Sequence, residues 1–432
     1  MKKATYLFGL IFFLIGLTVS GQQETVIDTT DKAYRNLLEL KYLEITSKTE
    51  LKLKNLPDKK VRKYLVDAYP EKKKEFLNLI KKGVFVEDEK YSPLLKSTFE
   101  EIKNANSDYD LSDILVLLSL NEQANAYNYG DGIIVINLPL AHNLDNEYQL
   151  AYVMSHEIAH QLLDHVNISM FKNAELNTSK GVQNQSKEIE KEKFNKQKKA
   201  ETYLKKLVYS SREGRRKHEH QADSLGFILF NKAYPKHMEV ALNALRLLKT
   251  IDEEKDSLVS ENYKRVFTTP NQNFKDEWLI SNKLANYNYS NTIRFWEVDS
   301  LRTHPDIDTR INFLKRTFNI SPSNEVINFS PYNKIKKDAN KEYVLILYFQ
   351  EEYGKSLYHT LISLKYSPDD VFYKKMLHDN LNKLREARNN YTLNRFLDTE
   401  NPKFSKSYNS FLSFIRNLRK AEFNEITEHY KY

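Results

Sequence analysis

The chain has 432 residues, of which 41% are hydrophobic and 29% charged, and its formal net charge is +8. This length predicts two or three domains, and this composition excludes a disordered chain. Lysine and arginine are spread along the sequence without a basic motif, so we expect no nucleic-acid partner. The absence of cysteine excludes disulfides and a lipid-modified cysteine.

The N-terminus has the pattern of a secretory signal peptide. Lys2 and Lys3 precede an apolar run over residues 6–19, and small residues follow near Gly21. The run is shorter than the roughly 20 residues of a spanning helix. We therefore predict a signal peptide over residues 1–21 and a periplasmic or extracellular mature chain with no transmembrane span. An uncleaved membrane anchor is the alternative.

Helices and a small sheet are predicted next. Residues 22–89 read as charged, amphipathic helices. The apolar runs at 114–118 and 133–136 are typical of strands, and the turn signal at 128–132 lies between them. We expect these two strands to form a small antiparallel hairpin.

A helix that starts after Asp145 carries His156, Glu157 and His160. Two histidines four residues apart project to the same side of a helix and can bind one metal ion. A glutamate beside the first histidine can take a proton from the attacking water. A surface helix with two unrelated histidines is the alternative, but apolar neighbours such as Leu150 place this helix in a core.

A third ligand is needed, with one position left open for water. The layout with a glycine and a third histidine soon after the motif fails, because Leu163 and Val166 occupy those places. The layout with a glutamate about twenty residues on fails too, because Ser179 and Lys180 stand there.

The segment 216–223 offers a better third ligand. Glu219 and Asp223 lie four apart on one helical face, so Glu219 is the candidate ligand. Asp223 would accept a hydrogen bond from a ligating histidine and fix its tautomer. His218 and His220 are competing ligands on another face, and an ordinary charged helix is the further alternative.

The remaining central segments are mostly helical. The polar stretch 166–217 contains a predicted solvated helix at 186–207, and further helices are expected at 218–230 and 238–248. Residues 251–300 read as a long irregular excursion with short helices.

Four sequence blocks together resemble the metallopeptidase family that includes the CAAX prenyl endopeptidases and the heat-shock protease HtpX. The similarity covers roughly residues 90–320. It departs from the family at Arg215, where a serine is usual, and at Ala233-Tyr234, where an Ala-Gly pair is common. The blocks are Asn125-Ala126 with the following turn and strand, His156-Glu157-x-x-His160 followed by His165, Arg216-x-x-Glu219-x-x-Ala222-Asp223, and Thr303-His304-Pro305 followed by Arg310-Ile311.

The resemblance implies one zinc ion per chain, bound by His156, His160 and Glu219, with Glu157 as the catalytic base. It also implies catalytic roles for His304 and Arg310, which would stabilise the oxyanion. In a second version, His304 occupies the open position on zinc and keeps the enzyme latent. A structural loop histidine is the alternative for His304.

Substrate is expected to add as a strand to an open sheet edge formed by residues 132–137, because strand addition reads backbone and not sequence. Extended or unfolded proteins are therefore the expected substrates. The predicted substrate-binding residues are Asn125, Ala126, Ile133, Ile134 and Val135.

The C-terminal residues 335–432 are predicted to be helical. Two helices around the turn at Ser367-Pro368 have the size of one degenerate tetratricopeptide-like repeat. Such a pair could dock an envelope protein partner. A pair of helices that only extends the protease core is the alternative.

The predicted fold is α+β and mostly α-helical. It has a zincin-like metallopeptidase core with a small antiparallel sheet at 90–325, an N-terminal helical segment at 22–89 and the C-terminal helical region. The expected function is a secreted or periplasmic zinc endopeptidase that hydrolyses extended or misfolded proteins in envelope quality control. The alternative is a catalytically silent zincin scaffold that acts as a binding protein or chaperone.

Overall fold

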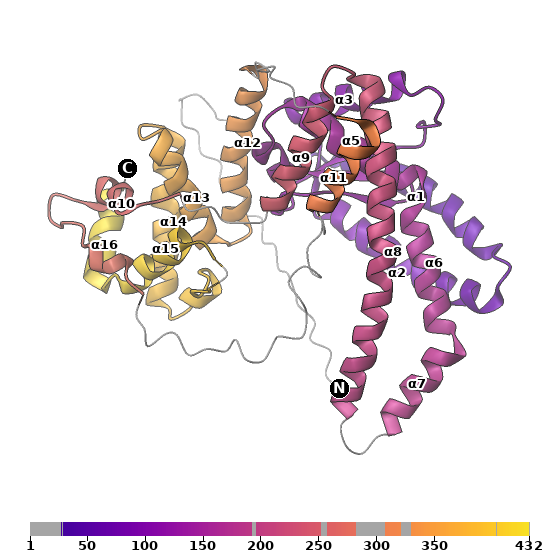
Figure 1. Ribbon diagram of the computed structural model, residues 1–432. Helices are drawn as coiled ribbons and strands as arrows, with labels where there is room; N and C mark the ends of the chain where they lie inside the picture. Colours follow the sequence, from indigo (N-terminus) through magenta and orange to yellow (C-terminus); the bar gives the residue numbers. More distant parts are fainter. Residues whose placement is uncertain are drawn as a thin grey trace. The chain divides into compact units, whose positions relative to one another are not determined.

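The computed structural model describes residues 27, 29–191, 196–251, 257–281, 307–320, 330–402 and 404–431. These residues form two compact units (Figure 1). The first unit contains Asp28–Asp252 and Asn288–Asn340, and the second contains Glu253–Tyr287 and Lys341–Tyr432. The predicted signal peptide lies outside the described residues.

The first unit holds a four-stranded sheet in the order β1-β2-β4-β3. β4 pairs in parallel with β2 and antiparallel with β3, and β1 pairs antiparallel with β2. The strands are β1 (Phe85–Val86), β2 (Leu115–Ser119), β3 (Ala126–Gly130) and β4 (Ile133–Asn137).

The expected antiparallel pairing of the two apolar runs is therefore wrong, and the sheet is mixed. The chain between these runs forms β3, which takes the antiparallel place beside β4. Gly130, Asp131 and Gly132 make the tight turn of this hairpin, all with positive φ. Gly132 has to be glycine, because an added Cβ would lie 2.5 Å from the Asp113 carbonyl oxygen.

β4 is buried on both faces, which explains why its sequence is a continuous apolar run. The helices α1 (Lys32–Lys54) and α2 (Lys59–Lys81) cover one face and share a core with the sheet. In this core Phe76 packs with Tyr42 and Phe85, and Ile133 and Val135 face the same cluster. The predicted N-terminal helical segment thus belongs to the same compact unit as the sheet.

A group of helices packs on the other face of the sheet, with α5 in its middle (Figure 1). Gly226 of α8 lies against α5, where an added Cβ would come within 2.8 Å of the His156 Cα. The absence of a side chain at Gly226 therefore lets the two helices approach closely at the first motif histidine. The helices are α3 (Tyr91–Ala105), α5 (Glu147–Leu162), α8 (Lys196–Ala233), α9 (Met238–Thr250) and α11 (Ile307–Phe318).

α8 is one continuous helix of 38 residues, in place of the separate helices expected within it. α7 runs beside its N-terminal half (Figure 1). The remaining helices of this unit are α4 (Leu138–Asn143), α6 (His165–Thr178), α7 (Lys180–Lys191) and the first part of α12 (Ser330–Phe349).

The second unit is a helical body with an aromatic-rich core that includes Trp278, Phe267 and Phe414. α13 and α14 form the helix-turn-helix pair that the sequence predicts around residue 368. Residues 257–281 share the core of this unit, although they were expected within the peptidase domain. Its helices are α10 (Ser260–Phe267), η1 (Asp276–Leu279), α13 (Tyr353–Tyr366), α14 (Val371–Asn389), η5 (Leu393–Arg395), α15 (Lys406–Asn417) and α16 (Lys420–His429).

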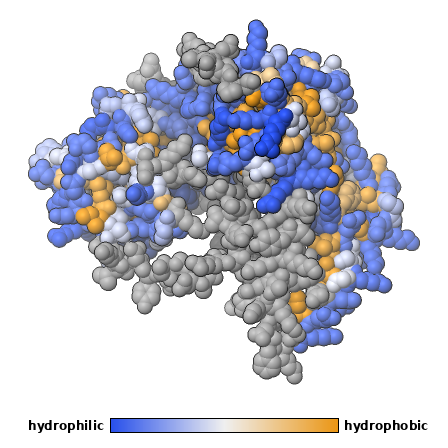
Figure 2. All heavy atoms as spheres, viewed as in Figure 1, coloured by the Kyte–Doolittle hydropathy of each residue, from blue (hydrophilic) through white to orange (hydrophobic). Residues whose placement is uncertain are grey.

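The prediction of a mostly α-helical α+β fold is confirmed. On the face shown in Figure 2, hydrophilic side chains dominate and apolar atoms form scattered patches. None of the described helices combines the length and apolar character needed to cross a membrane.

Candidate metal centre

α5 carries the first part of the site, and it is buried continuously from Gln149 to Ala159. Its N-terminus is capped by Asn146, whose side chain accepts a hydrogen bond from the Gln149 backbone N–H at 2.9 Å. The sequence predicts a helix that starts directly after Asp145, whereas the helix begins at Glu147. Because the sheet and the neighbouring helices surround α5, even its polar side chains His156 and Glu157 are only 5% exposed.

His156, His160 and Glu219 converge from α5 and α8. The two histidine Nε2 atoms lie 3.1 Å apart. Glu219 Oε2 lies 3.7 Å from His156 Nε2, and Glu219 Oε1 lies 3.6 Å from His160 Nε2. In the described part of the chain, these three form the one group of His, Cys, Asp or Glu side chains arranged to hold a metal ion.

The donor set fits zinc. Tetrahedral zinc with bonds of about 2.0–2.1 Å to nitrogen and oxygen separates its ligand atoms by about 3.3 Å, close to the observed spacings. Two imidazole nitrogens and a carboxylate are ligand types that zinc prefers, and Oε2 of this carboxylate also pairs with Arg310. Three protein ligands also leave the fourth position for water, as in catalytic zinc sites.

Asp223 and Arg310 contact two of the three candidate metal ligands, His156 and Glu219. His156 Nδ1 lies 3.1 Å from Asp223 Oδ1, and Arg310 donates to both Asp223 oxygens at 2.7 Å. Burial alone would raise the pKa of Asp223, but the Arg310 charge outweighs it and holds that pKa well below the usual range. Asp223 therefore stays ionised and keeps a proton on Nδ1 of His156, which leaves Nε2 free for a metal.

Arg310 is almost fully buried, at 1% exposure. Its Nη1 lies 2.8 Å from Glu219 Oε2, as an ion pair without hydrogen-bond alignment. The same guanidinium thus contacts Glu219 and Asp223, which are the two carboxylates of the α8 face. Because its three nitrogens lie at these two carboxylates, the geometry favours a positioning role over the predicted contact with an oxyanion.

His165 supports the second histidine in a different way. Its Nδ1 lies 2.9 Å from His160 Nδ1, and its Nε2 lies 3.3 Å from the side-chain oxygen of Gln221. The Gln221 oxygen can only accept, so His165 carries its proton on Nε2 and accepts from His160 through Nδ1. His160 Nε2 then has the free lone pair that a metal requires. Burial lowers the pKa of His165 to about 4, so its imidazole is neutral near pH 7.

Glu157 lies between the motif histidines and the edge strand. The backbone N–H of Asn128 in β3 donates to Glu157 Oε2 at 2.8 Å. Burial, and after it the charge of Glu219, raises the pKa of Glu157 to about 7, against a lowering by His156. A carboxylate with a pKa near neutrality suits a group that takes and returns a proton.

The other predicted site residues have different positions. Ile133, Ile134 and Val135 lie on β4, which is an interior strand, so the prediction that they form an open edge is wrong. The edge strand is β3, which starts at Ala126 directly after Asn125. Because the tight turn folds β3 back along β4, the later apolar run is covered.

Two of the other predicted histidines, His218 and His220, lie outside the metal group. His304 falls outside the described residues. His218 stacks on His165 at a centroid distance of 4.1 Å, and His220 packs edge-on against Phe313. Neither competing ligand on α8 therefore joins the three-residue group.

Sequence reasoning missed the roles of His165, Gln221 and Asn128. His165 follows the C-terminal end of α5 and a left-handed residue, Asp164, so its direction could not be read from helical spacing. The five-residue interval from His160 was the available signal, but an interval across a turn does not give the direction of a side chain.

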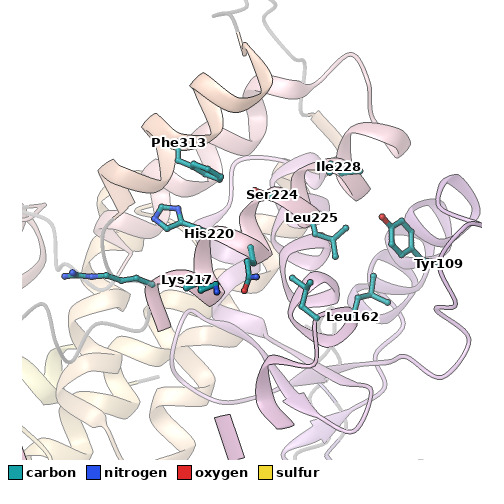
Figure 3. A pocket seen from close by; sticks show the side chains of 11 residues that line it. Tyr109, Leu162, Lys217, His220, Ser224, Leu225, Ile228 and Phe313 are labelled. Atoms are coloured by element: carbon teal, nitrogen blue, oxygen red, sulfur yellow. The ribbon is translucent and has the colours of Figure 1, made fainter. Parts of the chain in front are cut away.

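A hollow of about 880 Å³ lies on a face of α8 away from the three candidate ligands (Figure 3). Leu162, Leu225, Ile228, Tyr109 and Phe313 are among its lining residues. None of the three grouped metal-ligand candidates is part of this lining, so size alone does not identify the functional site.

A His-His-Glu group on two crossing helices, with a buried glutamate beside it, is the kind of centre found in zinc metallopeptidases. The model of Peptidase family M48 matches residues 91–318, more than half of the chain, and the chain belongs to this peptidase family. No curated protein matches the chain.

Proposed function

We propose that this chain is a zinc-dependent endopeptidase that hydrolyses extended or unfolded proteins. The observation that carries the proposal is the convergence of His156, His160 and Glu219 beside a buried Glu157, at the edge strand of the sheet. A silent binding scaffold would have no need for a base at this position.

His156, His160 and Glu219 would hold the zinc ion, which when bound supplies the Lewis acid that activates water and polarises the peptide carbonyl. Glu157 takes the proton of the attacking water and passes it to the nitrogen of the leaving peptide. Asp223 holds His156, and His165 holds His160, in the tautomer that leaves Nε2 for the metal. Arg310 keeps Asp223 ionised and holds Glu219 in an ion pair, and we propose it as a positioning residue.

The substrate backbone would add to the outer edge of β3. Among the described strands it pairs with β4 alone, and its Asn128 N–H already points to Glu157. A strand added at this edge places its carbonyl groups beside the base. Recognition through backbone groups favours extended segments over folded proteins.

The cellular setting is part of the proposal. The positive start and short apolar run of residues 1–21 favour secretion into the periplasm or the medium. A protease that selects unfolded segments suits envelope quality control. The α13–α14 pair is the proposed docking element for an envelope partner.

Metal removal tests this function. The purified chain should contain about one zinc ion and degrade casein, and a chelator should abolish cleavage until zinc is returned. Elemental analysis and gel-based cleavage assays measure both quantities. Bound zinc without cleavage would favour the silent scaffold, and cleavage that persists in the zinc-free protein would contradict the proposed chemistry.

A further inference from the structure

A hollow of about 570 Å³ lies directly beside the metal ligands in the first unit. His160 and Glu219 form part of its wall, and α2, α6 and α8 supply most of the rest. The other described residues that line it are Tyr64, Leu65, Ala68, Tyr69, Lys72, His165, Val166, Ser169, Met170, Asn173, Arg215 and His218.

The walls from α2 and α6 are largely apolar. Leu65 and Tyr69 are only 2% and 3% exposed, and they pack in one cluster with Met170. Such buried side chains are held by their neighbours, so the shape of this wall is fixed by the fold. A fixed apolar wall gains free energy when it contacts an apolar group and removes it from water.

Three polar groups of the α2 wall are directed to other partners. The Tyr69 hydroxyl donates to Asp131 Oδ2 at 3.1 Å, and Lys72 donates to the same oxygen at 3.0 Å. The Tyr64 hydroxyl accepts from the Asn177 side chain at 3.1 Å. A basic side chain in the hollow would lose water and would meet the positive charges of Lys72 and Arg215. An acidic side chain would find Lys72 already paired with Asp131, and an ion pair with the exposed Arg215 would contribute little.

The position of the hollow limits which substrate residue can reach it. Because two metal ligands line the hollow, a side chain inside it belongs to a residue next to the bond that is cleaved. Most of the apolar wall comes from α2, which lies outside the matched residues 91–318. The size of the hollow is therefore set partly by a segment that the family match does not cover.

We propose that this hollow is the main specificity subsite of the enzyme and takes one large, uncharged apolar side chain from a residue adjoining the scissile bond. Leucine, methionine, phenylalanine and tyrosine are the side chains it fits, and Ala68 lines it from α2. This assignment rests on the proposed peptidase function.

The test is a cleavage profile of the zinc-loaded, full-length protein on a mixed peptide library, read by mass spectrometry. Ala68→Trp fills the hollow from α2, and Ser169→Trp fills it independently from α6. Lys63→Trp is the matched control, because Lys63 is an exposed residue of α2 that does not line the hollow. Thermal unfolding shows that each variant is folded.

We expect the parent and Lys63→Trp to cleave next to large apolar residues at one fixed position. Either filling variant should shift that position to glycine, alanine or serine and cut the rate on a phenylalanine peptide by roughly 10–200-fold. Cleavage by the parent without such a preference, or an unchanged profile in both folded filling variants, would overturn the subsite alone. A zinc-loaded parent that cleaves nothing would overturn the peptidase function and the subsite with it.

Discussion

The two motif histidines are oriented by different chemistry. His156 lies against an ionised carboxylate, Asp223, whereas His160 lies against a neutral imidazole, His165. Each partner keeps a proton on the Nδ1 atom of its histidine and leaves Nε2 to the metal. Tautomer control therefore comes from two independent sources, one on α8 and one at the start of α6.

Replacement of His165 tests its part in this arrangement. His165→Phe keeps an aromatic ring against His218 but removes the acceptor for His160 Nδ1. We expect the zinc dissociation constant to rise by about 10–100-fold, measured by competition with a chromophoric chelator. His218→Phe is the control, because it keeps the stack without touching His160, and it should bind zinc like the parent. Equal zinc affinity in His165→Phe and the parent would contradict this role of His165.

At the scale of the elements, the site depends on how closely α8 approaches α5. A Cβ at Gly226 would lie 2.8 Å from the His156 Cα, whereas a Cβ at Gly214 in the same helix meets nothing within 4 Å. The helix therefore offers a substitution at a crowded contact and its matched control at an open position.

Gly226→Ala should destabilise the first unit by about 1–3 kcal/mol, because backbone atoms of α5 must move. Gly214→Ala should be neutral or stabilise α8 by up to about 1 kcal/mol, because alanine favours a helix more than glycine does. Urea unfolding followed by circular dichroism measures both changes. If Gly226→Ala is as stable as Gly214→Ala, the two helices do not cross as closely as described.

The sequence predicted the parts of the site that lie within one helix. His156 with His160, and Glu219 with Asp223, are pairs at a four-residue interval, so helical periodicity alone places each pair on one face. The approach of the two pairs depends on Gly226, which carries no chemical signature. Arg310 reaches the site from α11, and local spacing could not show that it pairs with the carboxylates of α8.

In the sheet, too, the sequence pattern predicts some elements but not how they pair. The apolar runs predict the strands β2 and β4, but no apolar run marks the polar strand β3 between them. Its residues Tyr127, Asn128 and Tyr129 are only partly buried and lack a continuous apolar pattern. Missing this strand gave the wrong pairing for β4 and moved the expected substrate edge to an interior strand.

At the scale of the whole molecule, the N-terminal helices are part of the unit that holds the metal centre. Phe76 of α2 is completely buried and stacks on Phe85 at a centroid distance of 4.8 Å. The same cluster includes residues of β4, the strand that supports β3. Loss of this core should therefore disturb the substrate edge as well as stability.

Phe76→Ala should lower the free energy of unfolding by about 3–5 kcal/mol, because it leaves a cavity in a well-packed core. Casein cleavage should fall with it. Leu51→Ala, on the exposed side of α1, is the control and should change stability little, since Leu51 is 63% exposed. Thermal unfolding and cleavage rates are the measurements. A fully stable and active Phe76→Ala would show that α2 is not integral to this unit.

The most direct test of the central claim is the cleavage rate of Glu157→Gln at unchanged zinc content. The substitution keeps the size of the side chain and an oxygen that can accept from the Asn128 N–H, but it removes the carboxylate that takes the proton. We predict a folded protein that binds zinc like the parent and cleaves casein at least about 100-fold more slowly, in line with the usual contribution of general acid–base catalysis. Cleavage at the parental rate by zinc-loaded Glu157→Gln would contradict the proposed mechanism.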